Sequence, residues 1–115
     1  MITTLIVYYQ NQQVTLSVND IAYLLYHEDM YYITSLKGIA YEAKLDYSFA
    51  DLAGVLDQEV FFKINDTNIV SCQAIKAVYE DEFGNYTLDL DPKPTFPKSF
   101  HDHGGSGLFD HFNYN

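Results

Sequence analysis

Turn signals recur about every 8–12 residues along positions 1–90, and this spacing favours short strands over long helices. Residues 21–26 form a continuous apolar run, which is typical of a strand covered on both faces. Residues 14–18 alternate between apolar and polar side chains, the period of a half-buried strand. The remaining strand candidates are residues 2–9, 30–36, 39–45, 61–64, 68–71, 75–80 and 86–90.

One helix interrupts this series of strands, and Ser48 begins it. The Ser48 hydroxyl can accept from an early backbone N–H, and Asp51 three residues later completes a pair that resembles a capping box. Asp57 ends the helix, and its apolar positions follow one face: Phe49, Leu52, Ala53 and Leu56. Short strands with a single helix predict an all-β (mainly β) fold of stacked antiparallel sheets or a sandwich.

Glycine and proline mark the turns and the end of the domain. Gly38 supplies a positive φ to a hairpin turn between the strands at 30–36 and 39–45. Pro92, Pro94 and Pro97 make a central strand improbable beyond residue 91. We therefore predict one β domain over residues 1–98 and a flexible Gly/His/aromatic tail over residues 99–115. No internal repeat is visible in the sequence.

Charge sets the second constraint. The chain has 115 residues with sixteen acidic side chains, six lysines and no arginine, a net charge of −10. Strong duplex-DNA binders neutralise about 6–10 phosphates, so nearly every lysine would have to lie on one face. Such a negative field slows approach to nucleic acid or to an anionic membrane. No apolar run is long enough to span a bilayer, and the single cysteine, Cys72, forms no internal disulfide; we expect a cytoplasmic protein with Cys72 buried.

The order of four short motifs resembles the LytTR family. Residues 20–23 (DIAY), 47–52 (YSFADL), 61–65 (FFKIN) and 68–71 (NIVS) follow one another at the family's spacing, and the resemblance spans residues 14–90. It implies an all-β DNA-binding output domain of a bacterial transcription regulator, such as a response regulator. In this family loops and strand ends, not a helix in the major groove, contact duplex DNA.

The resemblance carries over to five positions. Lys63 fits as a phosphate contact and Asn65 as an adenine reader. Tyr31 falls near the family's contact position in the first hairpin, and Lys98 is the nearest candidate for a late basic residue. Asp66 departs from the pattern, because it places a carboxylate where a basic or amide side chain is usual. Asn65 and Asp66 could instead form a local Asx-type turn, an alternative that the sequence favours.

A second hypothesis keeps the fold but replaces DNA with a protein. An alternating strand exposes about half of its side chains, and Tyr suits protein interfaces because an apolar ring carries a polar tip. Six tyrosines in the predicted strands and next to them together support a homodimer or a protein-docking module: Tyr8, Tyr9, Tyr31, Tyr32, Tyr41 and Tyr47. We expect no enzyme activity or cofactor, because no local catalytic signature is present. We expect no structural metal either, because the metal-capable groups fall in a Gly-rich tail: His101, Asp102, His103, Asp110 and His111.

Overall fold

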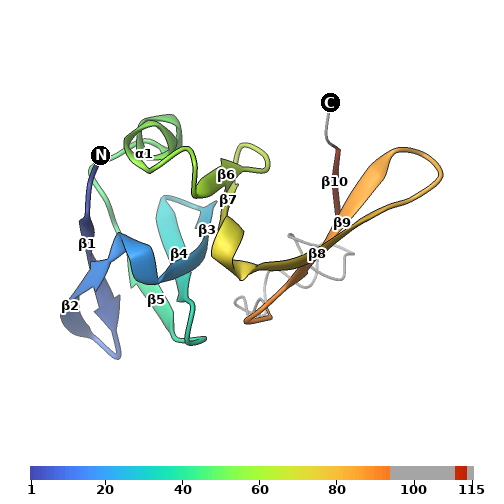
Figure 1. Cartoon of the computed structure of the whole chain (residues 1–115). Coiled ribbons are helices and arrows are strands. Elements are labelled where there is room, and N and C mark those ends of the chain that lie inside the picture. Colours follow the sequence, from blue (N-terminus) through green and yellow to red (C-terminus); the bar gives the residue numbers. More distant parts are fainter. Residues whose placement is uncertain (94–110, 114–115) are drawn as a thin grey trace.

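A computed structural model describes residues 1–93 and 111–113 (Figure 1). The described chain is built of antiparallel strands with one α-helix and two single 3-10 turns. This confirms the predicted all-β class with one short helix. In chain order the elements are β1 (Thr4–Tyr9), β2 (Gln12–Ser17), η1 (Val18–Asp20), β3 (Ile21–His27), β4 (Met30–Ser35), β5 (Ala40–Ala43), α1 (Phe49–Val55), β6 (Phe61–Lys63), β7 (Asn68–Ser71), η2 (Cys72–Ala74), β8 (Ile75–Glu80), β9 (Asn85–Leu90) and β10 (His111–Asn113).

Two antiparallel sheets organise these strands. The larger sheet has seven strands in the order β2-β1-β5-β4-β3-β7-β6, and the smaller has the order β10-β9-β8. Short turns with left-handed residues join neighbouring strands: Gln10 and Asn11 have φ of 50° and 65°, and Glu28 and Asp29 have 49° and 65°. Gly38 has a φ of 86°, as predicted for the β4–β5 turn.

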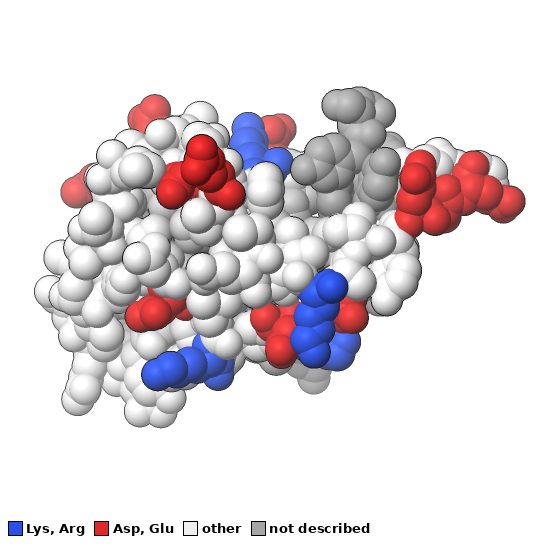
Figure 2. Space-filling view, in the orientation of Figure 1, with Lys and Arg blue, Asp and Glu red and all other residues white. Residues whose placement is uncertain are grey.

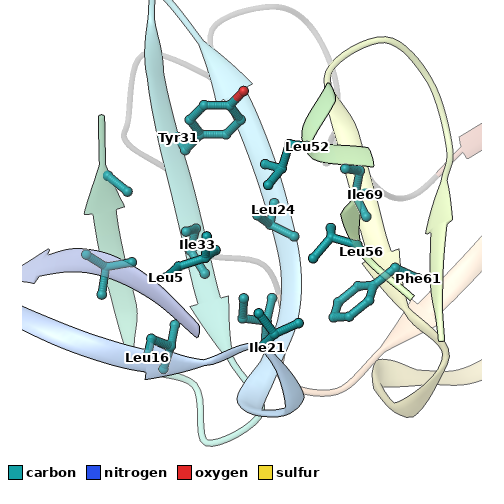
Figure 3. Close-up of a cluster of buried hydrophobic side chains, with 13 residues drawn as sticks. Leu5, Leu16, Ile21, Leu24, Tyr31, Ile33, Leu52, Leu56, Phe61 and Ile69 are labelled. Carbon is teal, nitrogen blue, oxygen red and sulfur yellow. The ribbon is translucent and has the colours of Figure 1, made fainter. Parts of the chain in front are cut away.

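The first hydrophobic core lies between the larger sheet and α1 (Figure 3). Ser48 caps the helix by accepting a hydrogen bond from the Asp51 backbone N–H at 3.1 Å, as predicted. Leu52 and Leu56 point from the helix segment towards Leu24 of β3, and all three are 0–1% exposed. The helix ends at Val55, two residues earlier than predicted, because Leu56 already has an extended backbone.

The second core lies on the other face of β3, where β9 packs. Leu88 and Leu90 of β9 belong to the same buried cluster as Tyr23 and Leu25 of β3. Residues 21 to 25 are all between 0% and 2% exposed, which confirms the predicted burial on both faces for these positions, whereas Tyr26, the last residue of the predicted run, is only partly buried. The Tyr23 hydroxyl donates to the Pro92 carbonyl at 2.9 Å, which links β3 to the segment after β9.

The structure shows an internal repeat that the sequence does not. Two hairpins, β1–β2 and β6–β7, each continue through a single 3-10 turn into the next strand, the blue and yellow turns of Figure 1. The Ser17 and Ser71 hydroxyls cap these turns by accepting from the backbone N–H two residues later, at 3.3 and 3.1 Å. The register of the following strand then shifts after Ile21 in β3 and after Ile75 in β8. We name the two segments the first unit (β1 to β4) and the second unit (β6 to β9).

Two predictions concern Cys72 and the C-terminal tail. Cys72 is exposed, so its predicted burial is wrong; it opens η2 and corresponds to the buried Val18 of the first unit. Of the predicted tail, residues 111–113 form β10 beside β9, and the remaining tail residues lie outside the described part. Within the described residues, no helix combines the length and apolar character needed to cross a bilayer.

Candidate nucleic-acid interface

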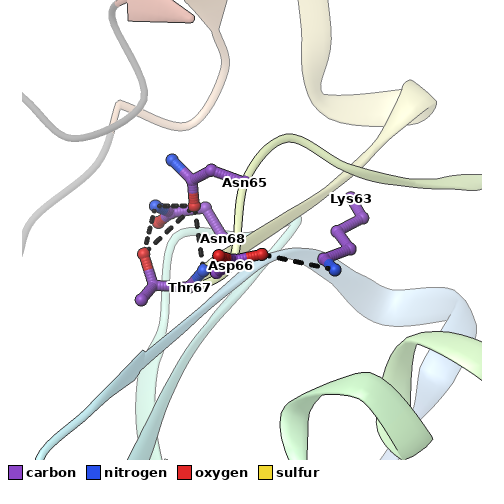
Figure 4. A network of polar contacts seen from close by, with 5 residues as sticks. All are labelled: Lys63, Asn65, Asp66, Thr67 and Asn68. Carbon is purple, nitrogen blue, oxygen red and sulfur yellow. Dashed lines mark hydrogen bonds and ion pairs between the residues drawn. The ribbon is translucent and has the colours of Figure 1, made fainter.

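The β6–β7 turn is a preorganised polar loop (Figure 4). The Asn65 side-chain oxygen accepts from the Thr67 backbone N–H at 2.9 Å, from the Thr67 hydroxyl at 3.1 Å and from the Asn68 amide at 2.9 Å. The Ile64 backbone N–H donates to the Asn68 carbonyl at 2.9 Å and closes the hairpin. These contacts confirm the predicted Asx-type turn.

The same bonds limit what Asn65 can recognise. Reading adenine takes two bonds, one accepted by the amide oxygen and one donated by the amide nitrogen. The Asn65 oxygen already serves three donors inside the turn, whereas its nitrogen points away from them (Figure 4). In this conformation Asn65 therefore offers only its amide nitrogen, a donor, to any outside ligand.

Asn68 holds the turn and was not among the residues singled out from the sequence. It is 1% exposed, and its amide nitrogen donates to the Asn65 oxygen and to the Thr67 hydroxyl, each at 2.9 Å. Its own side-chain oxygen has no hydrogen-bond partner among the described residues. The available signal was an amide opening an otherwise apolar strand, because buried amides need specific partners.

Lys63 lies beside this turn with its charge already engaged. Its ammonium is 3.5 Å from the Asp66 carboxylate and 5.8 Å from the centre of the Phe49 ring on α1. The Asp66 side chain is fully exposed and that of Lys63 is 45% exposed. Exposed ion pairs of this kind contribute little to stability, so the pair opens readily. The Asp66 carboxylate thus neutralises the Lys63 ammonium in this conformation.

Tyr31 does not belong to an exposed interface, and this expectation is corrected. The side chain is 1% exposed, and its hydroxyl donates to the Tyr47 carbonyl at 2.9 Å. Burial is the main reason why the pKa of Tyr31 is raised to about 12. The alternation along β4 places Tyr31 and Ile33 on the face that contributes to the first core, so the ring fills the core.

The five lysines within residues 1–93 do not form one basic face. Three of the five described lysines pair with aspartates: Lys63 with Asp66 at 3.5 Å, Lys76 with Asp91 at 3.6 Å and Lys93 with Asp89 at 3.7 Å. Figure 2 shows lysines at the upper and lower edges of the molecule, with acidic side chains between them. Acidic side chains gather at the tip of the β8–β9 hairpin, where Glu80, Asp81 and Glu82 are exposed. Lys98 lies outside the described residues.

An all-β scaffold that presents polar turns, with no helix projecting for a major groove, is one class of DNA-binding domain. The sequence matches the LytTr DNA-binding domain family over residues 11–102. The chain belongs to the LytTR family, which confirms the resemblance drawn from the sequence motifs.

A solved structure shows the same fold. It is the LytTr DNA-binding domain of a protein named as a methyl-accepting/DNA response regulator from Bacillus cereus. The TM-score is 0.70 at 18% sequence identity, and the match covers 82% of this chain and 84% of the other. A comparison with curated proteins gave no match.

Proposed function

We propose that this chain is the DNA-binding output domain of a transcription regulator, and that the β6–β7 turn is one of its contacts. Family membership supports duplex DNA as the partner. Two observations support the turn: the Asn65 amide nitrogen points away from the bonds inside the turn, and Lys63, two residues earlier in the chain, is half-exposed. Lys63 contacts a phosphate and Asn65 donates to a phosphate or a base edge. Such a regulator acts in the cytoplasm.

Asp66 weakens this contact without removing it. A phosphate that approaches Lys63 has to displace the Asp66 carboxylate, and the displaced carboxylate then lies close to the phosphate. Like charges at this separation repel, so the affinity is lower than in a turn with a neutral or basic side chain. The net charge of −10 lowers it further by slowing the approach to DNA.

Fluorescence anisotropy with a mixed-sequence duplex at low salt tests the proposal. Asp66→Asn removes the competing charge and is expected to strengthen binding by roughly fivefold. Asp66→Arg adds a phosphate contact and steepens the dependence of log K on log salt by about one. Lys63→Ala weakens binding. Glu82→Gln, which removes the same single charge from the tip of the β8–β9 hairpin, is the matched control and has the smaller effect.

Two results separate the role of the domain from the role of the turn. No binding by the wild type or by either Asp66 variant at about 50 µM, within the usual range of non-specific affinity, would exclude DNA as the partner. If Lys63→Ala and the Asp66 variants bind DNA as well as the wild type does, the domain still binds DNA but the contact lies in another loop.

The alternative function, protein docking, has its own supporting observation. Of the six tyrosines singled out from the sequence, four line one open groove of about 470 Å³ beside β1 and β5: Tyr8, Tyr9, Tyr32 and Tyr41. Tyr31 and Tyr47 instead contribute to the first core. The groove is distinct from the β6–β7 turn in its lining residues, so both functions are compatible in one domain.

A further inference from the structure

A single cross-strand row gives the groove its chemistry. Tyr8 of β1 pairs with Glu42 of β5, and Glu42 pairs in turn with Tyr32 of β4. Directly paired residues carry their side chains on the same face of a sheet, about 4.5–5.5 Å apart at Cβ. The Glu42 carboxylate therefore has a tyrosine ring on either side.

The environment of Tyr32 agrees with this arrangement. The pKa of Tyr32 is raised, first by burial and then by the carboxylates of Glu42 and Glu28. Glu42 itself is exposed and forms no ion pair with a lysine in the described part of the chain. Lys44, the nearest lysine along the chain, also forms no ion pair within the described residues, and it does not line the groove.

The groove is open because β1 and β5 are joined loosely. Their pairing register consists of Tyr8 and Glu42 alone, whereas β1 pairs with β2 over six positions. The rings of Tyr9 and Tyr41, which also line the groove, lie 5.7 Å apart at an angle of 59°. A volume of about 470 Å³ is within the usual range for sites that hold a compact group.

We infer that this groove binds the cationic side chain, arginine or lysine, of a basic segment from a protein partner. A carboxylate between aromatic rings combines a charge partner with ring faces that attract cations. A nucleic acid is the wrong occupant, because the lining contains a carboxylate and no basic residue. The acidic chain favours the same choice, since its field draws basic segments towards it. This inference does not depend on DNA binding.

A titration monitored by ¹⁵N-edited NMR tests the site directly. The probe is a short peptide, acetyl-Gly-Arg-Gly-amide, and its neutral counterpart carries citrulline in place of arginine. We expect the arginine peptide to shift the backbone signals of Tyr8, Tyr32 and Glu42, with the citrulline peptide binding much more weakly. Equal binding of the two peptides would overturn the inference, because a carboxylate site requires the positive charge.

Variants locate the effect. Glu42→Gln is expected to weaken the arginine peptide by roughly fivefold, and Tyr8→Leu by about threefold. Glu82→Gln removes an equal charge from the far hairpin, so it is expected to weaken the arginine peptide much less than Glu42→Gln does. An equal loss in Glu42→Gln and Glu82→Gln would show general attraction to an acidic protein and would overturn the site. Tyr8 is 46% exposed, and the dispersion of each variant's spectrum reports whether the fold is retained.

Discussion

The first and second units share one connection but use the strand that follows it differently. Counting from the capping serines, Leu24 of β3 corresponds to Val78 of β8, and Leu25 corresponds to Tyr79. Leu24 and Leu25 are 0% and 2% exposed, whereas Val78 and Tyr79 are 51% and 60% exposed. Both units have the same serine-capped 3-10 turn and the same register shift. This local structure therefore sets the direction of the following strand but does not decide whether that strand is buried. Burial depends on what packs against the strand afterwards.

The division has a functional side. In the first unit, β3 has β4 and β7 as neighbours and a core on either face. In the second unit, β8 is the outer strand of its sheet, and the β6–β7 turn and the β8–β9 tip are exposed. Leu24 of the first unit thus lies in a core, whereas the β6–β7 turn that we propose as a DNA contact is exposed in the second unit. Stability and recognition are therefore open to separate mutation.

Truncation at the matched positions provides the strongest test of this division. Leu24→Ala is expected to lower the free energy of unfolding by about 2–5 kcal/mol, because it leaves a cavity in the first core. Val78→Ala at the corresponding exposed position changes it by less than about 0.5 kcal/mol. Urea denaturation followed by circular dichroism measures both. Similar losses in the two variants would mean that β8 is buried in solution and that the division does not hold.

Alkaline pH offers a second test, because Tyr23 and Tyr31, the two tyrosines that are almost fully buried among those whose burial is described, both belong to the first unit. The pKa of Tyr23 is raised to about 12, mainly by burial with a contribution from Asp91, and that of Tyr31 to about 12, mainly by burial. Both groups keep their protons more tightly when folded. Their contribution to the free energy of unfolding is therefore complete below pH 10.0, the ordinary pKa of tyrosine, and is lost as the pH rises through about 12.

Between pH 10 and 12 the free energy of unfolding is expected to fall by about 2 kcal/mol for each of the two tyrosines. Replacing Tyr23 and Tyr31 by Phe removes this dependence, whatever the substitution does to stability at neutral pH. Thermal unfolding at a series of pH values measures the slope. Ala77, which corresponds to Tyr23 in the second unit, has no group that titrates. If the double Phe variant loses stability with rising pH as steeply as the wild type does, other titrating groups cause the loss.

The capping serines give the smallest expected effect and bear on the shared connection itself. Ser17→Ala and Ser71→Ala each remove one acceptor for a backbone N–H and are expected to lower stability by about 1 kcal/mol. Ser71 is 1% exposed and Ser17 is more exposed, so the loss at Ser71 is the larger of the two. Thermal unfolding of the two variants side by side measures the difference. A neutral result at both serines would mean that the strands alone fix the connection.

The sequence predicted the features that depend on neighbours along the chain. Alternation and turn residues gave the strands, Ser48 the helix start, and Asn65 the turn in which its side chain is bonded locally. Choices between adjacent residues were less certain: Tyr31 and Tyr32 lie on opposite faces of β4, and only packing beneath α1 decides which is buried. Cys72 was misplaced for the same reason, since Val18 at the corresponding position is buried.

Features that join distant segments were beyond sequence reasoning. The row of Tyr8, Glu42 and Tyr32 exists because β5 lies between β1 and β4, a strand order that no local pattern specifies. The contact of Lys63 with the Phe49 ring likewise depends on where α1 packs against the sheet. Local chemistry names candidate residues, and the topology decides which of them meet.

In the DNA contact that we propose, the engaged side-chain oxygen of Asn65 has a consequence for promoter selectivity. A side chain that only donates finds N7 as an acceptor on guanine and on adenine alike, so a single bond to N7 does not distinguish the two purines. Base substitutions from one purine to the other opposite this turn should therefore be tolerated. Preference for a particular operator then arises at other loops, or from the ease with which the duplex bends to meet them.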